Sequence, residues 1–182
     1  MERKKTKTGL LVQASVIAAL YVVLSLLTYQ FSYLQIQCRV AEALCMTIAY
    51  TPAGVWGVTI GCLLTNIFGG NPLDMIFGTL ATLIAAFLTL PIAKMLKKKY
   101  GDKPDIKHSL LIPIPTVLVN TIIIPFVLYF GYGITEMGSA TGRTSVLLLM
   151  ALSIFAGEAI SCFIFGPIII AVLNRIRGRL KL

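Results

Sequence analysis

The feature that most constrains this chain is a set of long apolar segments with very few charges inside them. Between Thr8 and Lys94 the charged side chains are Arg39, Glu42 and Asp74. About 20 apolar residues in a helix cross the ~30 Å hydrocarbon core of a bilayer. The 182 residues are 57% hydrophobic and 13% charged, whereas a soluble domain carries roughly 25% charged residues. The sequence therefore predicts an all-α, multi-pass membrane protein with a single domain over residues 1–182.

The basic residues predict how the chain is oriented. All lysines and arginines except Arg39 and Arg143 lie in three clusters, at residues 3–7, 94–107 and 175–181. Such clusters mark cytoplasmic ends of membrane spans and are attracted to anionic lipid, so nucleic-acid binding is not expected. With both termini and the 94–107 loop in the cytoplasm, an even number of spans must precede Lys94. Four spans fit before this loop and two after it.

Six transmembrane helices follow from this count. We expect the first to be a membrane span and not a cleaved signal peptide, since no cleavage-site pattern follows it. The second is the shortest, and Pro52 disfavours helix at the residue before it. The expected spans cover residues 9–29, 38–50, 53–68, 73–95, 110–130 and 144–174.

Two charged residues of the second helix indicate a ligand site. Arg39 and Glu42 are three residues apart, so on a helix they share a face and can touch. A charge at membrane depth costs roughly 3 kcal/mol, which favours an interior or polar-cavity position. The alternative is a buried ion pair that only fixes helix packing, although such pairs seldom add net stability.

Further polar residues are expected near the same outer region. Asp74 opens the fourth span and could cap its N-terminus or bind ligand. Glu158 lies near mid-membrane and needs a partner, a proton or a wet cavity, with Arg39 as a structural alternative. Asn120 could contact the ligand or bond to another helix. Tyr33 belongs to a group of aromatic residues at the outer ends, most of them interfacial, of which one or two could stack on a planar ring.

No catalytic set is visible, so an enzyme is not expected. The single histidine, His108, lies in the basic loop, and the four cysteines form no C-x-x-C pair, so no metal site is expected. A Walker motif for ATP is also absent from the sequence, and the energy for transport would come from a partner or an ion gradient.

Several motifs together resemble the QueT family. They are Arg39-Val-Ala-Glu-Ala-Leu44, Thr51-Pro-Ala53, Gly61-Cys-Leu-Leu-Thr-Asn66 and Leu73-Asp-Met-Ile-Phe-Gly-Thr-Leu-Ala-Thr82, with Glu158 matched by its position in the last helix. Members of this family are substrate-binding (S) components of energy-coupling factor transporters, assigned to queuosine precursors.

The resemblance implies a six-helix S component in the bacterial cell membrane with a site near its outer face. It implies docking on a transmembrane T component driven by two ATPases, which would hydrolyse the ATP. Ala14 and Ala18 match the family's docking motif on the first helix, although close packing between helices would also explain them. The implied ligands are 7-deazaguanine bases or queuine, read at their guanine-like edge by Glu42 or Glu158 with help from Arg39. Two alternatives stay open: a stand-alone ion-coupled carrier with Glu158 as its proton site, and an S component for another planar vitamin.

Overall fold

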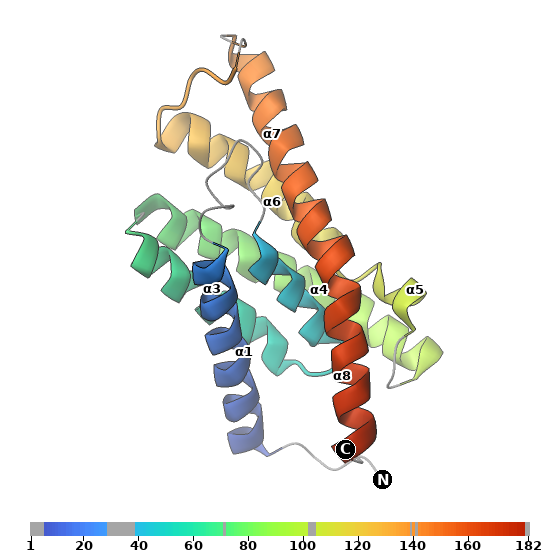
Figure 1. Cartoon of the computed structure of the whole chain (residues 1–182). Helices are drawn as coiled ribbons and strands as arrows, with labels where there is room; N and C mark the ends of the chain where they lie inside the picture. Colours follow the sequence, from blue (N-terminus) through green and yellow to red (C-terminus); the bar gives the residue numbers. More distant parts are fainter. Residues whose placement is uncertain are drawn as a thin grey trace.

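The protein is built from helices, as the computed structural model in Figure 1 shows. The structure describes residues 6–28, 39–70, 72–101, 105–138, 140 and 142–180, with side chains described up to residue 176. Apart from an isolated bridge between Met137 and Ala140, the described residues contain no strand pairing. The helices in chain order are α1 (Lys7–Leu27), η1 (Val40–Ala49), α3 (Ala53–Gly69), η2 (Asp74–Gly78), α4 (Thr79–Tyr100), α5 (Ile106–Ser109), α6 (Ile114–Phe126), η3 (Val127–Gly131), α7 (Arg143–Ile160), η4 (Ser161–Phe165) and α8 (Gly166–Leu180).

Four helical stretches in the described part of the chain are long and apolar enough to cross a membrane. They are Lys7–Leu27, Asp74–Tyr100, Ile106–Gly131 and Arg143–Ile176, while Val40–Ala49 and Ala53–Gly69 are shorter apolar helices. These stretches correspond to the six expected spans. The α1 helix and the Asp74–Tyr100 stretch begin or end up to five residues away from the expected bounds, and the last span extends beyond residue 174.

The second and fifth spans differ from the prediction in form. The second is a 3-10 helix of 10 residues, which at about 2.0 Å per residue is too short to cross a ~30 Å core. In the fifth, the helix begins at Ile114 and not at residue 110, because a turn through Pro113 separates α6 from the short α5, which lies before the expected span. Proline lacks the amide hydrogen needed to continue a helix through this point.

The η1 helix lies at the centre of the molecule. It packs against α1, α3, α4, η4 and α8, and eight of its 10 residues are buried. Its short length is therefore tolerated, because irregular backbone at membrane depth needs to be enclosed by protein. This enclosure also places Glu42 inside the protein.

The α1 and α3 helices pack very closely through glycine. A methyl group at Gly57 would lie 2.6 Å from Cβ of Ile17, and one at Gly61 would lie 2.5 Å from Cβ of Tyr21. Small residues at these positions let two helix backbones approach each other. The contact holds Tyr21 against the centre of the molecule, where it is 2% exposed.

The ends of α3 follow from local sequence. The helix begins directly after Pro52 and ends at Gly70, whose φ of 68° is left-handed. Glycine adopts this conformation without steric cost, which makes it a common residue after a helix. The chain then turns and enters η2, which brings Asp74 next to the end of α3.

Candidate binding site

Glu42 is a buried carboxylate held by a tyrosine of another helix. The Tyr21 hydroxyl on α1 donates a hydrogen bond of 2.5 Å to Oε1 of Glu42 on η1. Glu42 is 2% exposed. A hydroxyl donor to a carboxylate is a strong hydrogen bond and offsets part of the cost of burial.

Arg39 and Asp74 form an ion pair between the start of η1 and the start of η2. Nη2 of Arg39 lies 3.9 Å from Oδ2 of Asp74. Asn66, near the end of α3, donates a hydrogen bond of 2.7 Å to the backbone oxygen of Asp74. Oδ1 of Asp74 is buried and has no hydrogen-bond partner in the described part of the chain. Asp74 is therefore held on one side and has an unused acceptor on the other.

Glu158 has the same combination of a held oxygen and an unused one. Nδ2 of Asn120 on α6 donates a hydrogen bond of 2.8 Å to Oε1 of Glu158 on α7. Glu158 is 3% exposed, and among the described residues its Oε2 has no hydrogen-bond partner. An unmade hydrogen bond on a buried charged group is costly, so this oxygen indicates a place for an external donor.

These groups belong to one electrostatic cluster. Arg39 interacts with Glu42 and Asp74, and Glu158 interacts with Glu42 and Arg39. Within the described residues the cluster thus sets one guanidinium against three carboxyl groups. A polar molecule that brings hydrogen-bond donors would compensate the excess of acceptors.

The π-helical turns lie next to the cluster. Asp74 is the first residue of η2, and Glu158 precedes η4 by one turn. Such turns are rare and occur frequently at functional sites. Tyr132 follows η3 and interacts with Asp74, and its partial burial and this carboxylate raise the pKa of the Tyr132 phenol. Tyr132 thus reaches the cluster from the connection between η3 and α7.

The structure brings together most of the residues predicted for the site, but it changes the pairing. Arg39 forms its ion pair with Asp74, whereas we expected it to touch Glu42, which accepts from Tyr21 instead. Arg39 is the residue before η1 and not part of a regular α-helix, so the expected spacing on one helix face does not apply. Asn120 donates a hydrogen bond to Glu158 on another helix, which is one of the two roles expected for it from the sequence.

Three predicted residues are not part of the cluster that the structure describes. Tyr33 lies outside the described residues. Ala14 and Ala18 are 7% and 5% exposed, and their carbonyl groups face Gly57 and Gly61 of α3. Close packing with α3 thus accounts for both alanines, and their role in docking stays a prediction.

Sequence reasoning missed three residues that build the site. They are Tyr21, Asn66 and Thr82, and the Thr82 hydroxyl contacts Sγ of Cys62 at 3.3 Å and interacts with Glu42. Tyr21 could have been found, because it lies on the same helical face as Ala14 and Ala18, and a buried tyrosine hydroxyl needs a partner. Asn66 and Thr82 each end a motif that carries the family resemblance, which is the signal that could have drawn attention to them.

In the part of the chain that the structure describes, no group of three or more His, Cys, Asp or Glu side chains is arranged to hold a metal ion. The buried cluster instead offers carboxylate acceptors and one guanidinium donor. Those groups suit a polar organic molecule with several donors.

Comparison with known proteins assigns the chain to a family. The sequence model of the QueT transporter family matches residues 11–175. The chain belongs to the QueT transporter family. It is thus a multi-pass protein of the cell membrane, in agreement with its long apolar helices.

A relative supports the family assignment over part of the chain. The Queuosine precursor transporter QueT of Lactococcus lactis subsp. cremoris (strain MG1363) is 35% identical over 99 residues. This alignment covers 53% of the present chain and 59% of the relative, so the match spans somewhat more than half the length of each protein. No solved structure matches the chain.

Proposed function

We propose that this QueT family chain is the S component of an energy-coupling factor importer and takes up a queuosine precursor. The ligand would be a 7-deazaguanine base or queuine, bound from outside the cell. The observation that carries the proposal is Oε2 of Glu158, a buried acceptor without a partner among the described residues, beside an Asn120 that orients the carboxylate.

The proposed chemistry follows from the carboxylate oxygens that have no hydrogen-bond partner among the described residues. A guanine-like edge carries two neighbouring donors, N1–H and the 2-amino group, and a carbonyl oxygen beside them. Glu158 would accept from this edge through Oε2, and Arg39 would donate to the carbonyl. Glu158 is favoured over Glu42 for this role, because Glu42 receives both Tyr21 and Thr82, whereas Oε2 of Glu158 has no partner among the described residues. A cationic 7-aminomethyl group would find a second acceptor in Oδ1 of Asp74.

The arrangement of helices supports an outward-facing site. The beginning of α1 and the end of α8 lie at the same end of the molecule (Figure 1). Asp74 stands at the opposite end of its span from Lys97, Lys98 and Lys99. If the basic ends are cytoplasmic, the Arg39–Asp74 pair lies toward the outside, where the substrate arrives.

Binding of a 7-deazaguanine to the purified chain tests the proposal. We expect Glu158→Gln to weaken binding of 7-aminomethyl-7-deazaguanine about tenfold or more, as expected when a hydrogen bond to a charged group is lost. Glu136→Gln is the control, since Glu136 is exposed in the outer connection. Melting temperatures in detergent would show that each variant is folded. Unchanged affinity in both Glu158→Gln and Glu42→Gln would remove this ligand assignment.

The partners are tested separately. We expect the chain to co-purify with a T component and two ATPases when it is isolated from its own cells in mild detergent. A chain that binds substrate yet transports it alone, driven by a proton gradient, would instead favour an ion-coupled carrier. The free Oε2 of Glu158 would then be the proton-binding atom.

A further inference from the structure

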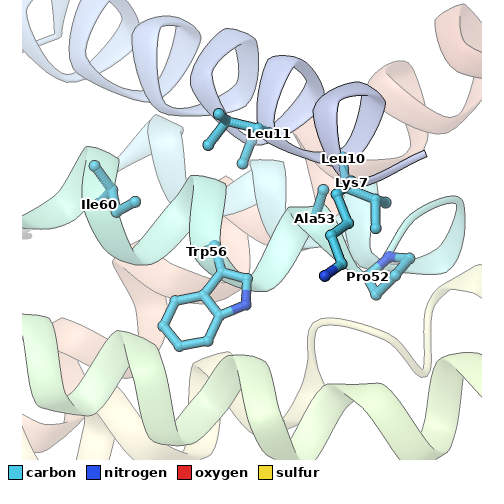
Figure 2. A pocket seen from close by; sticks show the side chains of 8 residues that line it. Lys7, Leu10, Leu11, Pro52, Ala53, Trp56 and Ile60 are labelled. Carbon is cyan, nitrogen blue, oxygen red and sulfur yellow. The ribbon is translucent and has the colours of Figure 1, made fainter. Parts of the chain in front are cut away.

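A groove that none of the charged-cluster residues line lies between the beginnings of α1 and α3 (Figure 2). Its volume is about 400 Å³, and it opens on the outer surface of the helix bundle. The residues that line it are Lys7, Leu10, Leu11, Ala14, Pro52, Ala53, Trp56 and Ile60. None of the residues assigned to the substrate is among them, so the groove is separate from the substrate site, although it shares Ala14 with the predicted docking motif.

The polar side-chain groups that line the groove are hydrogen-bond donors. The Lys7 ammonium and the indole nitrogen of Trp56 point into the same space, while Leu11 and Ile60 line the groove away from Lys7 (Figure 2). Both nitrogens are donors, and the lining side chains include no acceptor. A matching molecule must therefore bring negative charge at one end and hydrocarbon at the other.

The indole is held in place by the neighbouring helix. Its ring meets the Phe87 ring of α4 edge to face, with 6.2 Å between the ring centroids. Trp56 nevertheless remains 55% exposed. A fixed tryptophan beside a lysine is typical of the membrane–water interface, where phosphate head groups lie.

We propose that the groove binds one anionic glycerophospholipid. Its phosphate would lie between the Lys7 ammonium and the Trp56 indole N–H, and one acyl chain would follow Leu11 and Ile60. Under the orientation proposed above, Lys7 lies at the cytoplasmic interface, so the lipid comes from the inner leaflet. The charge complementarity favours a lipid over a helix of a partner protein, because an apolar helix would leave both donors unpaired.

The single tryptophan of the sequence provides a direct test. Because Trp56 lines the groove, quenching of its fluorescence by lipids with brominated acyl chains reports contact with lipid in the groove. In vesicles doped with brominated phosphatidylglycerol, half-maximal quenching should need roughly fivefold less lipid than with brominated phosphatidylcholine, the preference expected of one lysine at a membrane surface.

Variants of Lys7 identify the source of this preference. Lys7→Gln should abolish it, and Lys7→Arg should retain it. Lys107→Gln, which removes a charge outside the groove, should behave like the unchanged protein. Lys7 is exposed, so neither substitution should affect folding.

Three results would overturn the proposal. They are equal quenching by the two lipids, a preference that survives Lys7→Gln, and a Trp56 that neither lipid quenches, which would mean that the groove is closed or belongs to a protein partner. The assay uses neither substrate nor partner proteins, so its failure would leave the proposed transport function untouched.

Discussion

Glu42 keeps its carboxylate inside the protein because another helix supplies a donor. Tyr21 provides the hydrogen bond, and Thr82 and Arg39 add interactions from two further directions. Glu158, by contrast, receives one donor from Asn120, and its other oxygen has no partner among the residues that the structure describes. Under the proposed function, Glu42 therefore has a structural role and Glu158 a binding role.

Tyr21→Phe should destabilise the chain. The substitution removes the hydroxyl that lies 2.5 Å from Oε1 of Glu42 and leaves a buried carboxylate with one donor fewer. Loss of such a partner costs about 1–3 kcal/mol, so the melting temperature in detergent should fall. Tyr129→Phe is the matched control, since it removes a tyrosine hydroxyl from a residue of η3 that is only partly buried. Equal melting temperatures for the two variants would contradict this structural role of Tyr21.

Single residues also show how far the sequence could predict the site. The cost of burying charge was enough to expect that Arg39, Glu42, Asp74 and Glu158 avoid lipid, and the structure gathers them in one cluster. The partners could not be predicted, because they come from different helices whose rotation about their axes depends on the whole packing. Arg39 therefore pairs with Asp74 across 35 positions of sequence, whereas spacing alone suggested Glu42.

The pair of helices α1 and α3 acts as a rigid support for Tyr21. Ala14 and Ala18 on one helix face Gly57 and Gly61 on the other, and this small-residue contact permits a backbone approach that larger side chains would prevent. Tyr21 follows Ala18 by three residues, so the same contact fixes the direction of its ring. The position of the Glu42 donor thus depends on the glycines of α3.

Gly61→Ala should separate these helices and destabilise the protein. The new methyl group would lie 2.5 Å from Cβ of Tyr21 and 3.1 Å from the Ala18 carbonyl oxygen, and neither can move without displacing backbone. Overpacking of this kind costs about 1–3 kcal/mol, which exceeds the small helical preference of alanine over glycine. Thermal unfolding in detergent measures the effect.

Gly142→Ala is the control for this substitution. A methyl group there meets only the hydroxyl of the exposed Ser145, at 3.2 Å, which needs to shift by only a few tenths of an ångström. The control should melt close to the unchanged chain. If Gly61→Ala is as stable as Gly142→Ala, the close approach of α1 and α3 does not limit stability.

The sequence predicts where the helices lie, but not which type of helix each segment forms. Hydropathy and proline positions predicted all six helical segments, and at most of the helix ends the predicted bound lies within a few residues of the observed one. The 3-10 form of η1 has no such signal, because it arises from enclosure by five neighbouring elements. The π-helical turns are equally invisible, since one extra residue in a turn leaves the apolar pattern unchanged.

The distribution of charge gives the molecule two different ends. The basic residues gather at the start of α1, at the end of α4 and at the end of α8. The Arg39–Asp74 pair and Tyr132 lie at the other ends of their elements. Because basic residues are retained in the cytoplasm during insertion, this asymmetry predicts the orientation of both the proposed substrate site and the proposed lipid groove.

Labelling of introduced cysteines measures that orientation. In a Cys38→Ser background, Glu136→Cys should react with a membrane-impermeant maleimide in intact cells, because Glu136 is exposed in the connection between η3 and α7. Lys107→Cys in α5 should react only after the membrane is permeabilised, since the 94–107 segment is expected in the cytoplasm. The three other cysteines, Cys45, Cys62 and Cys162, are buried and should stay unlabelled in the background chain. The reverse labelling pattern would mean that the molecule has the opposite orientation, with the Arg39–Asp74 pair toward the cytoplasm. An importer could then not capture its substrate from outside at this cluster.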